Sequence, residues 1–482
     1  MLLLGAAWGL AVALLHIGWP YSVDFGEGLT LTGALKIAGG GLGAGYAYVD
    51  RYYQAPLLDY PPLYPLLVAG LYKLGVPLLV AGRGLAVVSC LAVGGMVGLL
   101  AKREGATRWL VAACVLLPLG GYPFLMWAGV GRIDALGIAL TLGGCYLATS
   151  KQEASARLNL VAAALCFALA IFTKQSMVAA PTAVVLAGLS LAGERKRAVW
   201  LAGLTGAFAG LLLLAMQTAT DGAYLNIVTA ERNAAFSSLR AVQNYAVFAG
   251  IFAALLLLAG VGWWRLRRAT TLGQRAIFIY WPAAWLVAAT VGKFGSAEYY
   301  FMELLAVTIL LAVIGYTQPD RASWSGWRLA GFSGASLAQA MMLAAVVATG
   351  QGIELHGFQR EAAARQVVAA LQSAAGADVF CDVPGLLLVA GRADQVYDRY
   401  ILRQLTRAGL RDDAAEVADL RRKRWAVVVL SFDPFASDPG GDWDAGSWPP
   451  DFLAAVQQGY QTVAIAQGKD GTAQYWLLKP RQ

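Results

Sequence analysis

Trp19-Pro20-Tyr21-Ser22-Val23-Asp24-Phe25-Gly26-Glu27-Gly28 directly follows the first apolar segment of the chain. Its two acids, Asp24 and Glu27, stand three residues apart, so a helical turn would place both on one face. A carboxylate beside a hydrophobic segment is costly to desolvate, and such acids are candidates for a functional site. The alternative is a solvated loop whose acids cap the next helix.

The composition indicates a polytopic membrane protein. Of the 482 residues, 58% are hydrophobic and 14% are charged, whereas soluble domains have about 25% charged residues. The mean hydropathy is +0.58. The net charge of +8 would suit a nucleic-acid partner. Much of it, however, lies in short loops between apolar segments, where Lys and Arg orient a protein in the bilayer. We therefore expect a membrane partner and no nucleic acid.

Apolar segments predict about 11 membrane spans, since one span needs roughly 20 apolar residues. They are residues 2–20, 83–101, 109–127, 133–150, 158–172, 176–193, 198–217, 244–262, 276–291, 301–316 and 329–349. Neither a basic segment nor a small-residue cleavage site marks the first of them. We therefore interpret it as a retained helix and not as a signal peptide.

Lys and Arg in alternate loops predict the orientation. The basic loops, predicted to be cytoplasmic, carry Lys102, Arg103, Arg108, Lys151, Arg157, Arg195, Lys196, Arg197, Arg265, Arg267, Arg268, Arg275, Arg321 and Arg328. The predicted external loops carry Asp24, Asp134, Lys174 and the stretches 218–243 and 292–300. The N-terminus is then cytoplasmic, and an odd number of spans places the C-terminus outside.

Residues 61–80 are apolar enough to resemble a further span. Counting them would invert every later loop and place the basic clusters outside. We therefore predict that 61–80 form a helix in the outer interface, a depth that suits Tyr64, Tyr72 and Lys73. The whole of 21–82 becomes one external loop.

Charged residues become frequent after residue 350, as in a soluble fold. Short apolar runs at 378–381 and 425–430 predict buried strands. Helices are expected at 361–373, 399–409, 413–423 and 450–459, and a terminal strand pair at 461–466 and 474–478. The predicted fold is thus mainly α, with a membrane domain over 1–349 and a small external α/β domain over 350–482.

Polar groups occur at four membrane edges that share the predicted external face. They are Asp24 with Glu27, Arg132-Ile133-Asp134, Thr173-Lys174-Gln175, and the stretch 292–303. Snorkelling residues would be scattered over both faces and would avoid carboxylates. We therefore predict one polar cavity, in which a carboxylate acts as general base and Lys or Arg holds a phosphate leaving group. The alternatives are lipid-headgroup anchoring for Lys174 and Lys293, and a helix N-cap for Asp134.

Few metal ligands have a suitable spacing. His16 and His356 are far apart, and the five cysteines form neither a CxxC pair nor a disulfide framework. Two carboxylates such as Asp24 and Glu27 can hold a divalent ion if further oxygens join them. We assign no metal ligands and leave a divalent cation open. The phosphate-binding motif GxxxxGKS and the nucleophilic-serine motif GxSxG are both absent from the sequence.

The order of these features resembles the GT-C superfamily of membrane glycosyltransferases. It is most similar to the branch that contains lipid A aminoarabinose transferases and protein O-mannosyltransferases. The resemblance rests on the acids at 24–27, Asp59-Tyr60-Pro61-Pro62-Leu63-Tyr64-Pro65, Arg132-Ile133-Asp134-Ala135-Leu136, Thr173-Lys174-Gln175, and Gly292 to Glu303. The Tyr-Pro-Pro-Leu-Tyr-Pro block is more specific evidence for this resemblance than the individual acids are.

The resemblance implies an inverting glycosyltransferase that takes a sugar from a polyprenyl phosphate on the external face. The acceptor would be a lipid, a glycan or a protein. Asp24 matches the first-loop catalytic acid and Asp134 the second-loop acid, while Lys174 and Lys293 are candidates for the donor phosphate. Because the first motif is Asp-Phe-Gly-Glu and not adjacent Asp-Glu, the base is either Asp24 or Glu27. The other expected substrate-binding residues are Tyr60, Arg132, Gln175, Ser296 and Tyr299.

Such a protein is expected in a bacterial plasma or inner membrane, with the C-terminal domain periplasmic or extracellular. Two other functions use the same features. A transporter or flippase of a lipid-linked sugar would need the cavity and no base, but no inverted repeat is evident. A non-catalytic assembly protein would not need the acids of the first loop. The match assigns no role to residues 350–482.

Overall fold

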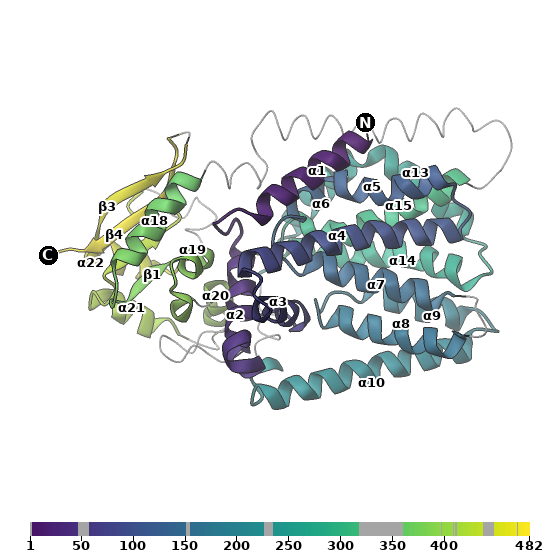
Figure 1. The fold of residues 1–482 in the computed structure, drawn as a ribbon, viewed down its shortest axis with the longest axis horizontal. Coiled ribbons are helices and arrows are strands. Elements are labelled where there is room, and N and C mark those ends of the chain that lie inside the picture. The colour runs from purple at the N-terminus through teal and green to yellow at the C-terminus, as the bar shows by residue number, and fades with distance from the viewer. Residues whose placement is uncertain are drawn as a thin grey trace.

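The computed structural model describes residues 2–46, 57–150, 155–225, 235–317, 360–396, 398–407, 409, 412–436, 448–469 and 471–482. A large helical part is followed by a smaller α/β domain at one end of an elongated molecule (Figure 1). The predicted span 329–349 lies outside the described residues, as do Lys151, Arg321, Arg328 and His356.

Helices dominate the first part of the chain. They are α1 (Leu2–Ile17), α2 (Phe25–Tyr46), α3 (Leu63–Lys73), α4 (Leu78–Arg103), α5 (Arg108–Gly120), α6 (Tyr122–Trp127), α7 (Asp134–Ala148), α8 (Ala156–Ile171), α9 (Ala179–Ser190), α10 (Arg195–Ala219), α12 (Ser238–Ile251), α13 (Ala253–Leu266), α14 (Leu272–Ala288) and α15 (Met302–Thr317). The 3₁₀-helices η3 (Ala289–Gly292) and η4 (Glu298–Phe301) connect α14 to α15.

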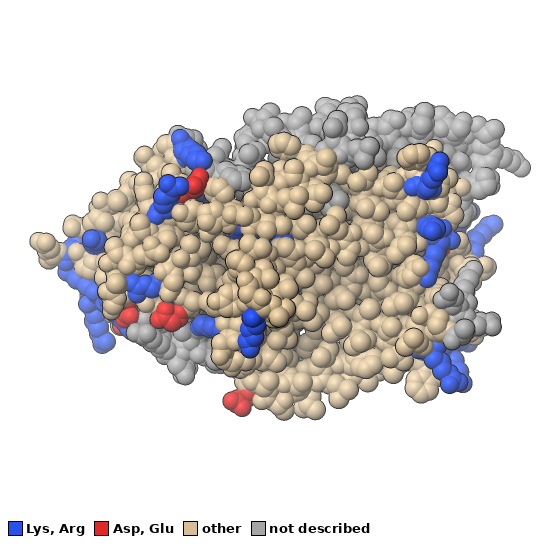
Figure 2. Space-filling model, in the orientation of Figure 1, with Lys and Arg blue, Asp and Glu red and all other residues tan. Residues whose placement is uncertain are grey.

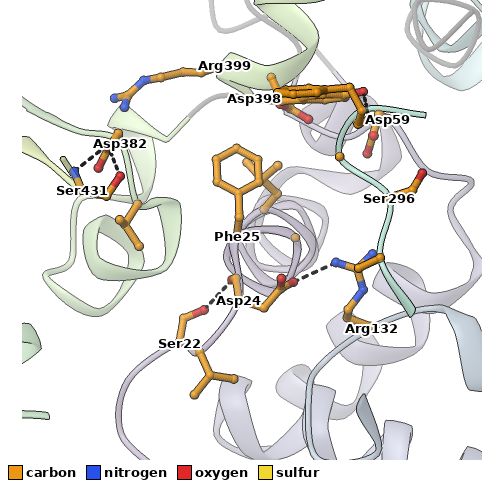
Figure 3. Close-up of a pocket in the computed structure, with 18 of the residues that line it drawn as sticks. Ser22, Asp24, Phe25, Asp59, Arg132, Ser296, Asp382, Asp398, Arg399 and Ser431 are labelled. Atoms are coloured by element: carbon orange, nitrogen blue, oxygen red, sulfur yellow. Dashed lines mark hydrogen bonds and ion pairs between the residues drawn. The ribbon is translucent and has the colours of Figure 1, made fainter. Parts of the chain in front are cut away.

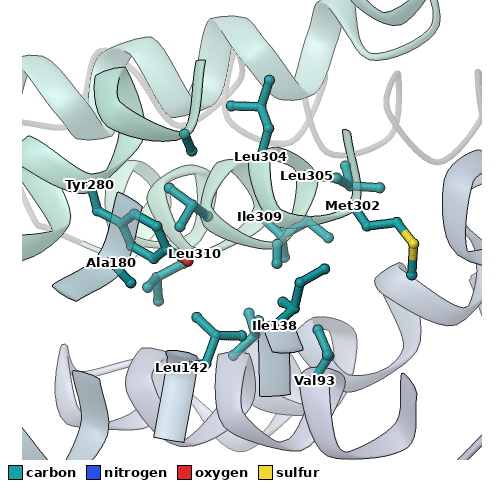
Figure 4. Packing of buried hydrophobic residues seen from close by; sticks show 14 of the residues in the cluster. Val93, Ile138, Leu142, Ala180, Tyr280, Met302, Leu304, Leu305, Ile309 and Leu310 are labelled. Atoms are coloured by element: carbon teal, nitrogen blue, oxygen red, sulfur yellow. The ribbon is translucent and has the colours of Figure 1, made fainter. Parts of the chain in front are cut away.

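Helix α15 is the centre of the helical packing. Every residue from Met302 to Gly315 is buried, as expected for a helix that is apolar on all sides apart from Glu303 and Thr308. Figure 4 shows Ile309 and Leu310 beside Ile138 and Leu142 of α7. On another side α13 approaches closely, because a Cβ at Gly262 would lie 2.1 Å from the carbonyl oxygen of Leu311. Small residues allow such close helix pairs in membranes.

Among the described residues, four helices are long and apolar enough to cross a membrane, or five if the bent pair α12 and α13 is one span. Four shorter apolar helices lie in α1, α7, α8 and α9. The mainly α membrane architecture is therefore confirmed, and the number of about 11 spans stays a prediction.

Several predicted segments differ in extent from the helices. Residues 25–46 of the predicted external loop form α2, and α4 begins at Leu78 instead of residue 83. The helix predicted at 61–80 ends at Lys73, because Gly75 takes a positive φ of 91° and Pro77 precedes α4. The segment 109–127 is divided into α5 and α6 at Gly121, whose backbone is extended. The segment 244–262 bends by 88° between α12 and α13.

Residues of the predicted cytoplasmic loops meet at one end of the helical part. Arg103 of α4 donates to the Thr149 hydroxyl at 3.5 Å, and Arg197 of α10 donates to the Ser150 carbonyl at 3.3 Å. Gln274 donates to Glu104 at 2.8 Å. On the face drawn in Figure 2, basic side chains gather at the end away from the C-terminal domain, and the surface over the helices between has few charges.

The C-terminal domain contains the predicted strands. They are β1 (Val379–Cys381), β2 (Val427–Leu430), β3 (Tyr460–Gln467) and β4 (Ala473–Pro480) in the order β1-β2-β4-β3. β1 and β2 are parallel, whereas β4 pairs antiparallel with β2 and β3. The helices are α18 (Glu361–Ser373), α19 (Pro384–Val389), α20 (Arg399–Arg407), α21 (Ala414–Arg421) and α22 (Pro450–Gly459). Of these, α19 was not predicted from the sequence.

Two close contacts fix this domain on the helical part. A Cβ at Gly385 of α19 would lie 2.1 Å from the Cβ of Ser22, and a Cβ at Gly28 of α2 would lie 2.3 Å from the backbone nitrogen of Gly385. Elsewhere, the Tyr400 hydroxyl of α20 donates to the Phe294 carbonyl, and the two rings stack with centroids 6.2 Å apart. The domain therefore lies directly against the first loop and the 293–300 segment.

The orientation can be tested by thiol labelling. We expect a cysteine placed at Lys469 to react with a membrane-impermeant reagent added outside, and one at Arg267 to be protected, because basic loops stay cytoplasmic. Cys166 is replaced by serine beforehand, since the other four native cysteines are buried. Labelling of the cysteine at Arg267 and protection of the one at Lys469 would show that the orientation is the reverse of the predicted one.

Candidate active site

A cavity of about 940 Å³ lies between the helical part and the C-terminal domain, a size typical of ligand sites. Of the sequence-predicted site residues, those that line it are Asp24, Tyr60, Arg132, Lys293, Ser296 and Tyr299. Those that do not line it are Glu27, Asp134, Lys174 and Gln175. Loops far apart in the sequence thus converge on one polar cavity, and part of the predicted set lies behind its wall.

Asp24 sits at the start of α2 with one carboxylate oxygen held in place. Its Oδ2 accepts from the Glu27 backbone N–H at 2.9 Å and from Arg132 Nη1 at 2.8 Å (Figure 3). The first bond is a helix N-cap. No hydrogen bond joins Oδ1 to any residue that the structure describes, and the Asp24 side chain is 17% exposed. Asp24 can therefore cap the helix and still present an oxygen to a ligand.

Glu27 is buried and its oxygens are occupied. Arg83 of α4 donates Nε to Oε1 at 2.7 Å and Nη2 to Oε2 at 2.9 Å. The backbone N–H groups of Gly131 and Val23 donate to the same carboxylate at 2.9 and 3.1 Å. Burial alone would raise the pKa of Glu27, but Arg83 and these bonds outweigh it and hold the pKa below its usual value. Glu27 is thus placed to join the first loop to α4.

Arg132 lines the cavity and is joined to two buried charges behind its wall, Asp134 and Lys174. Its Nε lies 3.4 Å from Asp134 Oδ2, and Lys174 Nζ donates to Asp134 Oδ1 at 2.6 Å. The Arg132 guanidinium lies 4.1 Å from the centroid of the Tyr299 ring, and Lys174 Nζ lies 3.9 Å from that of Tyr300. Buried charges are tolerated when they are paired in this way. Asp134 and Lys174 therefore hold Arg132, which in turn holds Asp24.

Lys293 and Arg240 of the helical part supply positive charge to the cavity. A short antiparallel bridge pairs Phe236 with Lys293, so the start of α12 lies against the segment after η3. Arg240 of α12 donates to the Ser296 carbonyl. We did not predict Arg240 from the sequence; its position in the external stretch 218–243 was the only available signal.

The C-terminal domain forms one wall of the cavity, which the sequence did not indicate. It contributes Asp382, Arg399, Arg403, Gln404, Ser431 and Trp448. Three of them lie on α20, whereas Asp382 follows β1, Ser431 follows β2 and Trp448 precedes α22. No motif connects them with the first loop. Only the docking of the domain brings them to the cavity.

Within the described parts of the chain, no group of three or more His, Cys, Asp or Glu side chains is placed to hold a metal ion. Asp24 and Glu27 do not converge, because Glu27 faces Arg83. The described residues therefore do not fit a divalent cation at this pair.

No protein-family model matches the sequence, and no curated protein sequence matches it. The structure is similar to the crystal structure of ArnT from Cupriavidus metallidurans bound to undecaprenyl phosphate, with a TM-score of 0.65 and 14% identity over 99% of this chain and 97% of that one. It is also similar to the oligosaccharyltransferase AglB from Archaeoglobus fulgidus in complex with an inhibitory peptide and a dolichol-phosphate. That TM-score is 0.55, with 11% identity over 98% of this chain and 73% of that one.

A third structure, of the Archaeoglobus fulgidus oligosaccharyltransferase in complex with Zn and sulfate, has a TM-score of 0.51 and 12% identity over 98% of this chain and 72% of that one. At such identities the likeness concerns the fold. ArnT is a lipid A aminoarabinose transferase, and both it and AglB are GT-C members. The chain therefore has the fold of the GT-C superfamily of membrane glycosyltransferases, as its loop motifs indicated.

Proposed function

We propose that this protein transfers a sugar from a polyprenyl-phosphate donor to an acceptor bound in the cavity, on the external face of a bacterial plasma membrane. The observation that carries the proposal is Asp24, whose Oδ2 is held by Arg132 in a cavity that also contains Lys293 and Arg240. A carboxylate beside fixed cations suits a displacement at a phosphate-linked carbon. The structures of ArnT with undecaprenyl phosphate and AglB with dolichol-phosphate support a lipid-linked donor.

Asp24 is the proposed general base. Oδ1 takes the proton of the acceptor as the acceptor oxygen or nitrogen bonds to the anomeric carbon of the sugar. The bond from that carbon to the phosphate oxygen breaks in the same displacement, so the configuration inverts. Because Oδ2 is fixed by Arg132 and the Glu27 N–H, the base needs little reorganisation.

Lys293 and Arg240 are the proposed partners of the polyprenyl phosphate, which gains negative charge as it leaves. Both line the cavity, whereas Lys174 is 3% exposed and already bonded to Asp134. Trp127 is a further proposed sugar contact, since it lines the cavity and its buried Nε1 has no acceptor among the described residues. Lys174 and Asp134 then act as positioning residues through Arg132.

Transfer is tested with purified protein, radiolabelled polyprenyl phosphate sugars and membrane extracts as acceptor. We expect the label to move from the donor lipid into an acceptor, with release of polyprenyl phosphate. Donors that cross a vesicle membrane unchanged would instead support transport. Donors that stay intact without crossing, with every sugar tested, would contradict the proposal.

Replacing Lys293 by alanine is expected to raise the apparent KM for the donor or to lower turnover by a factor of about 10–100, because a charged hydrogen bond is worth roughly 1.5–3 kcal/mol. Transfer kinetics measured over a range of donor concentrations check this. The matched control is Lys73→Ala, since this exposed lysine does not line the cavity. Equal activity in both variants would assign Lys293 to lipid anchoring.

A further inference from the structure

The wall that the C-terminal domain contributes to the cavity contains buried acceptor atoms that lack donors. Asp382 Oδ2 accepts from the Ser431 backbone N–H at 2.8 Å and from the Ser431 hydroxyl at 2.6 Å. Its other oxygen, Oδ1, receives no hydrogen bond from another described residue, and the same holds for Gln404 Oε1. Both residues line the cavity and are 9% and 1% exposed. Buried polar atoms of this kind call for a ligand or a water.

We infer that this wall is an acceptor subsite and that the acceptor it binds is a carbohydrate. The inference rests on the proposed function, because it places the acceptor opposite Asp24. It concerns a group of residues, Asp382, Arg399, Arg403, Gln404, Ser431 and Trp448, to which neither the loop motifs nor the similar structures assign a role.

The mixture of groups selects the class of ligand. Asp382 and Gln404 offer oxygens that accept hydrogen bonds, whereas the Arg399 and Arg403 side chains only donate them. Burial raises the pKa of Asp382, although the Ser431 bonds and Arg399 oppose this. A free anion would meet the carboxylate of Asp382, and a lysine-rich peptide would meet two guanidinium groups. Sugar hydroxyls both donate and accept, so they satisfy both kinds of group.

Aromatic rings complete the wall. Trp448 stacks on Phe452 with centroids 4.2 Å apart, and Arg403 lies 4.5 Å from the centroid of the Trp448 ring. Trp476 and Tyr475 of β4 also line the cavity. Aromatic side chains beside a few fixed polar groups are the usual composition of a small-molecule site.

The wall is placed for a sugar to reach the base. Figure 3 shows Asp382, Ser431 and Arg399 on one side of the cavity, Asp24 and Arg132 on the other, and Phe25 between them. The contacts of Gly385 with Ser22 and of Tyr400 with Phe294 hold the two sides together. A sugar bound against the wall would therefore present a hydroxyl toward Asp24.

Binding is tested without transfer, using the full chain in lipid nanodiscs and saturation-transfer NMR. The probes are cellobiose, chitobiose and mannobiose, with inorganic phosphate and a trilysine peptide for comparison. We expect at least one disaccharide to bind in preference to both comparison probes. Asp382→Ala and Gln404→Ala should each weaken it about tenfold, since one buried hydrogen bond is lost. The matched control Asp451→Ala, an exposed acid of α22 outside the cavity, should bind like the wild type.

Three results would overturn the inference. They are the absence of disaccharide binding to the wild type, preferential binding of phosphate or peptide, and unchanged sugar affinity in both cavity variants. The thermal midpoint of Asp382→Ala shows whether that variant folds. If it does not, the sugar affinity of Gln404→Ala decides, because this variant keeps the Asp382–Ser431 bonds.

The same assay separates this inference from the proposed function. Asp24→Asn should retain disaccharide binding, because Asp24 acts on the proton and not on the wall. Sugar binding that depends on Gln404 in a protein that transfers nothing would refute the transferase proposal alone. If Asp382→Ala and Gln404→Ala transfer sugar with the wild-type KM for the acceptor, the carbohydrate subsite is refuted and the transferase proposal stands.

Discussion

Asp24→Asn is expected to lower the rate of sugar transfer about 10²–10⁴-fold, the usual loss when a general base is removed. The amide keeps the shape of the side chain and can still accept from Arg132 and from the Glu27 N–H, but it cannot take the proton of the acceptor. Donor binding should change little, because Lys293 and Arg240 remain. Single-turnover transfer and equilibrium binding of a polyprenyl phosphate sugar measure the two quantities separately.

Glu27→Gln is the informative comparison. Because Glu27 faces Arg83 and does not line the cavity, we expect its turnover per folded molecule to stay near the wild-type value. A slower Glu27→Gln beside an active Asp24→Asn would move the base to Glu27. Full activity in both variants would remove the first loop from the chemistry.

Arg83→Met should destabilise the protein by roughly 3–5 kcal/mol, the cost of leaving a buried charge without its partner. Arg83 is fully buried and holds Glu27 as well as the carbonyl oxygens of His16, Trp19 and Tyr21. Thermal unfolding in detergent measures the loss. The matched control is Arg103→Met at the exposed end of the same helix, which should cost little.

The double variant Glu27→Leu with Arg83→Met tests the pair itself. Removing both charges should recover part of the stability lost in Arg83→Met, since no unpaired charge remains. An additive loss in the double variant would show that the two side chains are not coupled.

Acid should act through the same pair. The pKa of Glu27 lies below its usual value of 4.5 in the fold. Its contribution to the free energy of unfolding is therefore present above that pH and is lost as the pH falls through the lower, folded value. Glu27→Gln should flatten this part of the pH profile. If the free energy of unfolding of Glu27→Gln falls below pH 4.5 as steeply as that of the wild type, the acid sensitivity belongs to other groups.

The local parts of the fold follow from the sequence. Apolar length located most of the helices from α1 to α15 but not α2, which lies in the predicted external loop 21–82. Short apolar runs located β1 and β2, and β3 and β4 form the terminal strand pair expected from the sequence. These features depend on neighbouring residues, so periodicity and composition are sufficient to find them. The breaks at Gly121 and Phe252 were missed, because a long apolar segment does not reveal where packing bends it.

The sequence also predicted that the loops of Asp24, Arg132 and Lys293 share one cavity, since alternate loops of a membrane bundle lie on the same side. It could not divide the roles within that set. Asp24 and Glu27 are three residues apart, yet one lines the cavity and the other is paired with Arg83. That division was decided by the packing of α2 against α4, because a buried charge has to take a partner that the chain brings from 56 residues away.

Tertiary structure alone decided the opposite wall of the cavity. Asp382, Gln404 and Trp448 are unremarkable in the sequence, and each comes from a different part of the C-terminal domain. Their meeting with Asp24 depends on glycines at positions 28 and 385, where a Cβ would hold the domains apart. Contacts between distant segments arise from shape and burial over the whole fold, and no local pattern in the sequence encodes them.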